Sequence, residues 1–151
     1  MSTSSSFDRV GQFHRKFGLR VSGDSPPSII DEDTFLFRFQ FLLEELQELM
    51  KAHRGDDLPG VADALADLVY VALGTAHMYG IPFDEVFQEV QNANMRKERA
   101  RDSKDPRSKR SSSLDIIKPS GWLPPDIHGV LTRWVTDQQV VSVQEGEEIA
   151  K

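Results

Sequence analysis

The chain has 151 residues, of which 38% are hydrophobic and 28% charged, and its formal net charge at pH 7 is −6. This length suits a single domain with a buried core, and the acidic balance disfavours nonspecific binding to nucleic acid. The absence of cysteine excludes disulfides and thiolate metal sites. No basic segment followed by an apolar one begins the sequence, and the longest apolar segment carries two aspartates. We therefore expect neither a secretory signal nor a membrane span, and we expect a cytoplasmic protein, in the host cytoplasm if the source is viral.

Apolar residues at helical spacing predict an all-α fold with about four helices. The first expected helix ends at Gly18, acidic residues begin the second, and Pro59 lies near the start of the third. The expected helices cover residues 7–17, 31–53, 59–80 and 82–95. A short turn joins the second helix to the third, which predicts a helical hairpin at the centre of the fold.

The expected helix over 59–80 is apolar on more faces than the other helices of one chain can cover. An exposed apolar surface of that extent usually marks an interface. We therefore expect a homo-oligomer, a dimer or a tetramer, in which helices pair across subunits and complete the core.

The composition changes near residue 99, after the last expected helix. Residues 99–113 are rich in Arg, Lys, Asp and Ser and predict a flexible basic loop. Residues 114–128 combine Pro and Gly with large apolar residues, which predicts an extended strap, and 129–151 are expected to form a C-terminal tail after a domain over 1–128. The basic stretch lacks interleaved aromatic residues, so a solvated loop or a flap that attracts triphosphates is favoured over a nucleic-acid-binding arm.

Three glutamates lie in the middle of the otherwise apolar second helix. At 100° per residue, Glu45 and Glu48 share a side of this helix with Phe41 and Leu49, and Glu44 is adjacent. The pattern predicts that at least Glu45 and Glu48 point toward the core. Ionised carboxylates are almost never buried without a partner, because the loss of their hydration is costly.

Two aspartates repeat this pattern in the third helix. Asp63 and Asp67 are four residues apart and therefore lie on one helix face. They are the only acidic residues between Val61 and Phe83, and this segment contains neither Lys nor Arg. Five carboxylates on two adjacent apolar helices require cations, and oxygen ligands suit Mg²⁺ or Mn²⁺ rather than zinc.

The two acidic motifs resemble those of the MazG-like all-α nucleoside triphosphate pyrophosphohydrolases. The first motif, Glu-Glu-x-x-Glu, is complete and begins at Glu44. In the second, Glu-x-x-Asp, Asp67 matches the aspartate and Ala64 stands in place of the glutamate. Asp63 lies one position earlier, on nearly the same face, and could substitute for it.

Further matches extend the resemblance over residues 7–128. Asn94 and Lys97 resemble an Asn-Met-x-Lys motif that serves the metal-phosphate site in the family. The stretches 13–18 and 118–127 resemble a branch related to phosphoribosyl-ATP pyrophosphohydrolases and to dUTP-cleaving enzymes.

The resemblance implies Mg²⁺-dependent hydrolysis of a nucleoside or deoxynucleoside triphosphate to the monophosphate and pyrophosphate, with Mn²⁺ as a substitute. Such an enzyme controls a nucleotide pool, and dGTP, GTP and dUTP are its candidate substrates. The implied metal ligands are Glu44, Glu45, Glu48, Asp63 and Asp67. Glu44, which could instead orient or deprotonate the attacking water, and Glu45 are the candidate catalytic residues. The candidate substrate-binding residues are His14 and Phe17 for the base, together with Asn94, Lys97, Lys118 and Trp122.

Other function classes stay open at this stage. Within the enzyme class, phosphoribosyl-ATP pyrophosphohydrolase is the alternative, and a non-catalytic helical module that binds a nucleotide or a partner is the second. A ferritin-like di-iron bundle also buries carboxylates, but it requires Glu-x-x-His pairs. Here Glu45 is followed three residues later by Glu48, and Glu48 by Lys51, which excludes that arrangement.

Overall fold

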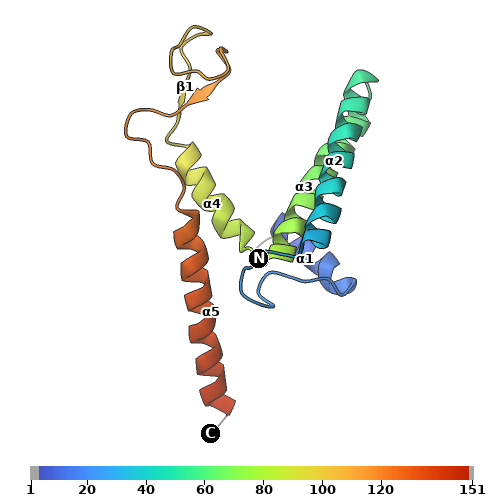
Figure 1. Ribbon diagram of the computed structural model, residues 1–151, viewed down its shortest axis with the longest axis vertical. Coiled ribbons are helices and arrows are strands. Elements are labelled where there is room, and N and C mark those ends of the chain that lie inside the picture. Colours follow the sequence, from blue (N-terminus) through green and yellow to red (C-terminus); the bar gives the residue numbers. More distant parts are fainter. Residues whose placement is uncertain (1–3, 150–151) are drawn as a thin grey trace.

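The computed structural model describes residues 4–149, and for 138 and 140–149 only the backbone. The described residues form five helices and one two-stranded ladder (Figure 1). The helices are α1 (Ser6–Lys16), α2 (Glu32–Arg54), α3 (Leu58–Tyr79), α4 (Phe83–Asn94) and α5 (Ile127–Ile149); the strands are β1 (Glu98–Arg99) and β2 (Ile116–Ile117). The predicted all-α class is confirmed.

Short polar side chains fix where the first three helices begin. Ser5 and Asp8 form a reciprocal capping box at α1, and the Asp31 carboxylate accepts a hydrogen bond from the Thr34 amide at the start of α2. Asp57 caps α3 in the same way. These residues satisfy amides that a helix cannot pair internally. The expected starts of the second and third helices therefore agree with the structure to within a residue or two.

The helices α2 and α3 pack against each other as the predicted hairpin, and α1 crosses α3 near its C-terminal end (Figure 1). The buried apolar core is small and lies at this crossing. Its members are Phe7, Val10, Leu73 and Ala76, with Ile81 and Phe83 packed against them. The outer part of the hairpin thus extends beyond the core.

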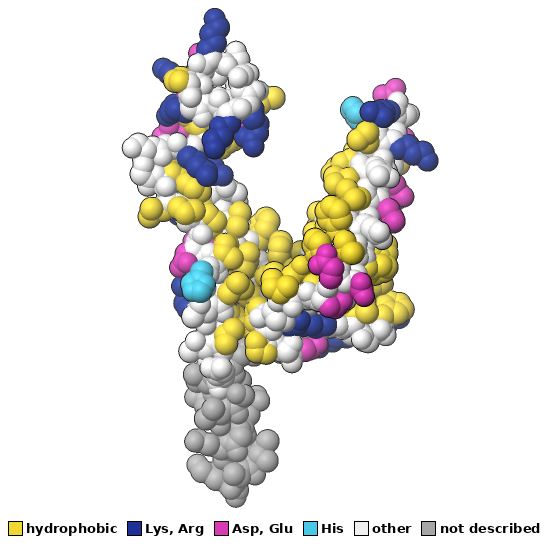
Figure 2. All heavy atoms as spheres, in the orientation of Figure 1, with side chains coloured by type: hydrophobic (Ala, Val, Ile, Leu, Met, Phe, Trp, Pro, Cys, Tyr) yellow, Lys and Arg dark blue, Asp and Glu magenta, His cyan; other side chains and the backbone are white. Residues whose placement is uncertain are grey.

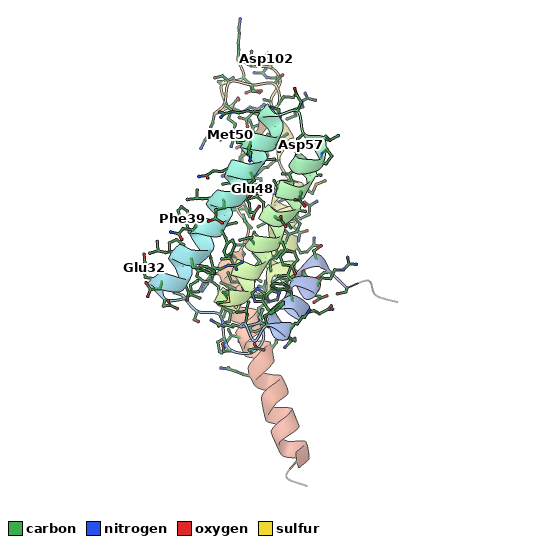
Figure 3. The ribbon with its side chains drawn as sticks, turned by 90° about the vertical axis from the view of Figure 1, so that its right-hand side faces the viewer. Glu32, Phe39, Glu48, Met50, Asp57 and Asp102 are labelled. Carbon is green, nitrogen blue, oxygen red and sulfur yellow. The ribbon has the colours of Figure 1, made fainter. Side chains whose placement is uncertain are left out.

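The molecule has two arms, one formed by the α2–α3 hairpin and the other by α4 and the segment that follows it (Figure 1). The space-filling view shows a hollow between the arms, bordered by hydrophobic side chains (Figure 2). None of the residues of α2 is buried. Figure 3 shows Phe39 and Met50 on the side of α2 that points away from α3. One chain therefore leaves much of the hairpin's apolar surface uncovered.

Helix α3 is also long and apolar enough to cross a membrane, with a mean hydropathy of 1.3 over its most apolar window. This property depends on length and composition only, and a core helix of a soluble protein shares it.

The C-terminal third contains structure that the sequence analysis did not predict. The segment over 129–151, expected to be a tail, belongs mostly to α5. Strands β1 and β2 pair antiparallel, with Glu98 opposite Ile117. Between β2 and α5 the chain has a turn at 120–121 and no helix or strand, so the extended strap stays a prediction, and the Trp122 indole N–H donates to the Ala93 carbonyl at 2.7 Å.

Two buried aspartates organise the loop between β1 and β2. Asp105 accepts hydrogen bonds from the Arg101 amide and from both the amide and the guanidinium of Arg107. Asp115 accepts from Ser108 and Arg110. Hydrogen bonds from the Arg107 side chain hold the pKa of Asp105 well below its usual range. The loop expected to be flexible thus has an internal hydrogen-bond network, while its mobility stays a prediction.

Candidate metal and nucleotide site

Packing of α2 against α3 brings the five predicted carboxylates into one electrostatic cluster, which we call the acid cluster. Its members are Glu44, Glu45 and Glu48 on α2 and Asp63 and Asp67 on α3. Glu45 is half-buried, and burial is the largest cause of a raised pKa at this carboxyl. The charges of the other four members raise it further, with Asp67 first in size and Asp63 last.

One oxygen of Glu45 is buried without a hydrogen-bond partner. Among the described residues, Glu45 Oε2 is the only buried carboxylate oxygen in this condition. A buried charged oxygen without a partner is costly, and native structures rarely leave one. A divalent cation with oxygen ligands fits this deficit and would relieve the repulsion within the cluster. No three acidic or histidine side chains among the described residues are arranged as a formed metal site, so binding would require some of these side chains to rotate.

The expected burial of Glu48 is wrong for a single chain. Glu48 is exposed at the seam between α2 and α3 (Figure 3), as are the remaining members of the cluster apart from Glu45. The prediction assumed a helix covered on several sides, whereas among the described residues α3 is the one element that packs extensively against α2. Ala64 is buried, whereas Asp63 is exposed like Glu48 and Asp67, and the substitution of Asp63 for the missing glutamate stays a prediction.

An aromatic pocket of about 180 Å³ lies one helical turn from the acid cluster. Phe41 precedes Glu45 by four residues and Tyr70 follows Asp67 by three, so each lies on the same helix face as the acid. The lining residues are Phe13, His14, Leu19, Arg38, Phe41, Tyr70, Val71 and Gly74. We call this space the aromatic pocket. Of the two residues predicted to bind the base, His14 lines the pocket and Phe17 does not. The Phe17 ring instead packs against Phe13, with the ring centres 4.7 Å apart.

Two nitrogen-bearing side chains supply the polar part of the aromatic pocket. His14 is buried, and its Nδ1–H donates to the Arg20 carbonyl at 2.8 Å. Burial lowers the pKa of His14, so the ring is neutral at pH 7. Arg38 donates from Nε to Thr75 Oγ1 at 3.1 Å and from Nη2 to the Val71 carbonyl at 2.8 Å. Burial lowers the pKa of this guanidinium, and no described carboxylate forms an ion pair with it.

Sequence reasoning did not single out Arg38, although a signal was available. Arg38 is the only charged residue between Thr34 and Leu43, in a segment that otherwise consists of Phe, Leu and Gln. A lone cation in such a run is as unusual as the acids that follow it.

The remaining predicted substrate residues lie on the other arm. Lys97 and Lys118 place their ammonium groups 5.3 and 4.4 Å from the centre of the Trp122 ring. Asn94 is exposed at the end of α4. The structure thus brings Lys97, Lys118 and Trp122 together, but in one chain the arm that bears them is separated from the hairpin arm that bears the acid cluster (Figure 1).

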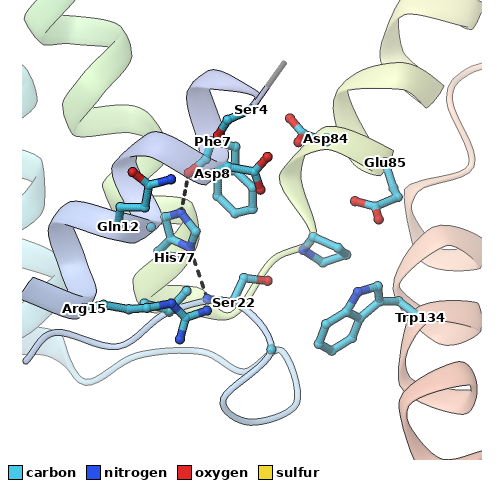
Figure 4. A pocket seen from close by; sticks show the side chains of 14 residues that line it. Ser4, Phe7, Asp8, Gln12, Arg15, Ser22, His77, Asp84, Glu85 and Trp134 are labelled. Carbon is cyan, nitrogen blue, oxygen red and sulfur yellow. Dashed lines mark hydrogen bonds between the residues drawn. The ribbon is translucent and has the colours of Figure 1, made fainter. Parts of the chain in front are cut away.

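A cavity of about 540 Å³ between α1, α4 and α5 has a different character (Figure 4). His77 lines it, but both ring nitrogens are engaged, by the Phe7 carbonyl at 2.9 Å and the Ser22 amide at 3.1 Å. The imidazole also stacks on the Phe7 ring at 3.8 Å. His77 therefore connects α1, α3 and the loop between α1 and α2, and none of the acid cluster lines this cavity.

The all-α hairpin with its paired acidic motifs agrees with the class of MazG-like all-α nucleoside triphosphate pyrophosphohydrolases. Within this class, the family model described as phosphoribosyl-ATP pyrophosphohydrolase matches residues 10–94, more than half of the chain. The chain belongs to this family, and the predicted resemblance is confirmed.

The chain is also similar to a viral protein. An uncharacterized protein of Acanthamoeba polyphaga mimivirus is 31% identical over 83 residues, which cover 54% of this chain and 33% of the viral protein. The chain thus spans about a third of the length of this relative, whose description states no activity.

Proposed function

We propose that this protein hydrolyses a nucleoside or deoxynucleoside triphosphate to the monophosphate and pyrophosphate with Mg²⁺, or Mn²⁺ in its place, and thereby controls a nucleotide pool. The observation that supports this most directly is the buried, unpartnered oxygen of Glu45 within a cluster of four further carboxylates. The family match supports a pyrophosphohydrolase of the nucleotide type.

In this proposal Glu45, Glu48 and Asp67 hold the metal, and the exposed Asp63 is an additional ligand. A bound Mg²⁺ polarises phosphoryl oxygens and acidifies water. Glu44, exposed at the edge of the cluster, orients the attacking water and accepts its proton, or alternatively serves as a further ligand. The water oxygen bonds to the α-phosphorus, and the bond from that phosphorus to the pyrophosphate oxygen breaks.

The base of the nucleotide enters the aromatic pocket, because the aromatic side chains that line this pocket lie one helical turn from the acid cluster. His14 contacts the base there, and Phe17 supports Phe13 from behind. The phosphates then extend toward the acid cluster. Because the base is bound away from the phosphorus that reacts, a change in the aromatic pocket should raise KM more than it lowers kcat.

We also propose that the site is completed in a homo-oligomer of two or four copies. The hairpin arm leaves α2 without a single buried residue, and Lys97 and Lys118 lie on the other arm. In the assembly, the arm that bears Asn94, Lys97, Lys118 and Trp122 of one copy meets the acid cluster of another. The lysines would then neutralise the phosphates of the substrate.

Subunit mixing tests this shared site. Glu48→Gln and Lys97→Ala should each be inactive alone, while an equimolar mixture that has exchanged subunits should recover about a quarter of the wild-type activity, because random mixed dimers hold one intact site. A monomer in light scattering, or a mixture as inactive as its components, would contradict the proposal.

The experiment that tests the reaction is pyrophosphate release from a panel of NTPs, dNTPs and phosphoribosyl-ATP, with and without Mg²⁺. We expect metal-dependent release that Glu48→Gln abolishes and Glu32→Gln retains. Glu32 lies in the first turn of the same helix, away from the cluster, and is therefore a matched control. Release only from phosphoribosyl-ATP would favour the alternative named by the family description. Metal binding without release from any compound would favour the non-catalytic module.

A further inference from the structure

His14 and Arg38 converge on one point of the aromatic pocket. A Cβ atom added to Gly74 would lie 2.7 Å from Arg38 Nη2 and 2.9 Å from His14 Nε2, so both nitrogens crowd the space above this glycine. The absence of a side chain at Gly74 therefore allows a guanidinium from α2 and an imidazole from α1 to approach the same place on α3.

The two groups have opposite hydrogen-bonding characters. Because His14 Nδ1 carries the proton that it donates to the Arg20 carbonyl, Nε2 of the neutral ring presents a lone pair. Arg38 can only donate, and its bonds to Thr75 and Val71 use Nε and one N–H of Nη2. The remaining N–H groups, including both on Nη1, have no acceptor among the described residues. The aromatic pocket thus offers a fixed acceptor beside a fixed, charged donor.

We infer that the aromatic pocket selects bases with a lactam edge, that is, a carbonyl oxygen next to a ring N–H, as in guanine, hypoxanthine, uracil and thymine. Arg38 donates to the carbonyl oxygen, and His14 Nε2 accepts the ring N–H. This inference rests on the proposed function and names the substrate class of that same site.

Adenine and cytosine carry the reverse pattern on the corresponding edge, an amino group next to a ring nitrogen with a lone pair. Their amino hydrogens would face the Arg38 donors, and the ring nitrogen would face the lone pair of His14. With the phosphates held at the acid cluster, the direction of the glycosidic bond is fixed, so the order of the two groups along the edge is fixed as well. A buried donor and acceptor left unpaired by the wrong base provide strong discrimination.

The size of the aromatic pocket agrees with a ring as its occupant. Its volume of about 180 Å³ is below the roughly 300–1,000 Å³ of pockets that enclose drug-sized ligands. The rings of Phe13 and Tyr70 meet edge to face at 5.5 Å, and Arg38 lies 5.7 Å from the centre of Phe41. The walls are therefore aromatic on the sides, with polar atoms at one place, which is how proteins hold a planar base.

Two matched pairs of nucleotides test the inference. The bases of dUTP and dCTP differ only at this edge, and so do those of dITP and dATP. We expect kcat/KM to be higher by about tenfold or more for dUTP and dITP within each pair. In Arg38→Gln this ratio should fall to near unity, mainly through a higher KM for dUTP and dITP. Arg54→Gln, the same change at an exposed arginine in the last turn of α2, should keep the ratio.

Several results would overturn the inference: equal kcat/KM within both pairs, a preference for dCTP and dATP, or an unchanged ratio in folded Arg38→Gln. If Arg38→Gln does not fold, Thr75→Val replaces it, because this change keeps the guanidinium but removes the hydroxyl that orients its Nε. A ratio in Thr75→Val equal to that of the wild type would then count against the role of Arg38.

Failure of the proposed function can be told apart from failure of the inference. If no nucleotide is hydrolysed with any metal, the hydrolase proposal fails. The same pairs, prepared as non-hydrolysable α,β-imido triphosphates, then measure base preference directly by calorimetric binding. Tighter binding of the uracil and hypoxanthine compounds would support the inference without turnover, and equal or absent binding would overturn it.

Discussion

The two arms of the molecule place acidic side chains in opposite environments. In the loop between β1 and β2, Asp105 and Asp115 are buried, and each of their carboxylate oxygens accepts at least one hydrogen bond. Their pKa values are lowered chiefly by hydrogen bonds from Arg107 and Ser108 respectively. In the hairpin arm, Glu45 is half-buried among four other acids, one of its oxygens has no partner, and its pKa is raised.

This difference separates a structural from a functional carboxylate. An acid that finds its donors within the chain stabilises the fold and has nothing left to bind. An acid that is held among like charges lowers the stability of the free protein and is satisfied only by a ligand.

The largest expected effect is on turnover. Glu45→Gln removes the charge at the centre of the acid cluster, and we expect it to lower kcat/KM about 100-fold or more, since even indirect supports of a metal ligand contribute 10- to 100-fold. Because the change also removes like-charge repulsion, the metal-free protein should unfold at an equal or higher temperature. Loss of activity together with a lower unfolding temperature would show that Glu45 stabilises the fold, and would contradict its assignment as a functional carboxylate.

The second prediction concerns the other arm. Asp105→Asn removes the charge that Arg101 and Arg107 share, and we expect hydrogen exchange at these two amides to accelerate by about tenfold or more, because hydrogen bonds to a charged group are the stronger ones. Asp102→Asn, at an exposed position in the same loop, is the control. Exchange that is as slow in Asp105→Asn as in the control would mean that Asp105 does not organise the loop.

The third prediction is a smaller effect of pH on metal affinity. A raised pKa means that protons compete with metal at Glu45 at a higher pH than at an ordinary glutamate. Affinity for Mn²⁺ should therefore fall as the pH is lowered from 7.5 toward 5.5, with net proton release on binding. Asp105 and Asp115, whose pKa values are lowered, stay ionised over this window, so exchange protection in their loop should not change. Calorimetry in buffers of different ionisation enthalpy measures the proton release, and its absence would argue against the raised pKa.

The smallest effect is on stability, through two buried histidines. Burial lowers the pKa of His14, which faces Arg38, and of His77, which faces Asp8 and Arg15, below the ordinary value of 6.5. The unfolded chain then binds protons that the folded chain does not, so the stabilising contribution is present above pH 6.5 and declines as the pH falls below it. Denaturant unfolding of Glu45→Gln, in which the opposing effect of the raised Glu45 pKa is absent, should show a lower midpoint at pH 5.5 than at pH 7.5. An unchanged or higher midpoint would mean that the two rings are protonated in the folded state.

Local rules predicted the parts of the fold in which pattern and capping agree. The hairpin followed from apolar periodicity bounded by Asp31 and by Asp57 with Pro59. Helix α5 was missed because residues 129–151, which have an acidic end, were expected to form a C-terminal tail. The anchors Asp105 and Asp115 were missed because composition alone marks their loop as irregular, whereas the pairing of particular acids with particular arginines is a tertiary property.

The candidate site was predicted in its residues but not in its environment. The acids were found because they interrupt apolar faces, yet Glu48 was expected to be buried and is exposed, since burial depends on neighbours that one chain does not provide. Residues of three helices line the aromatic pocket. Sequence spacing within one helix therefore could not predict that Arg38 and Gly74 lie close together.

The most direct test of the contrast between the arms is a calorimetric titration with Mn²⁺ of the wild-type protein, Glu45→Gln and Glu32→Gln. If the unpartnered carboxylate is a metal ligand, the wild type and Glu32→Gln bind alike and Glu45→Gln binds at least about tenfold more weakly. Equal affinity in all three proteins would contradict the assignment of the acid cluster as the metal site.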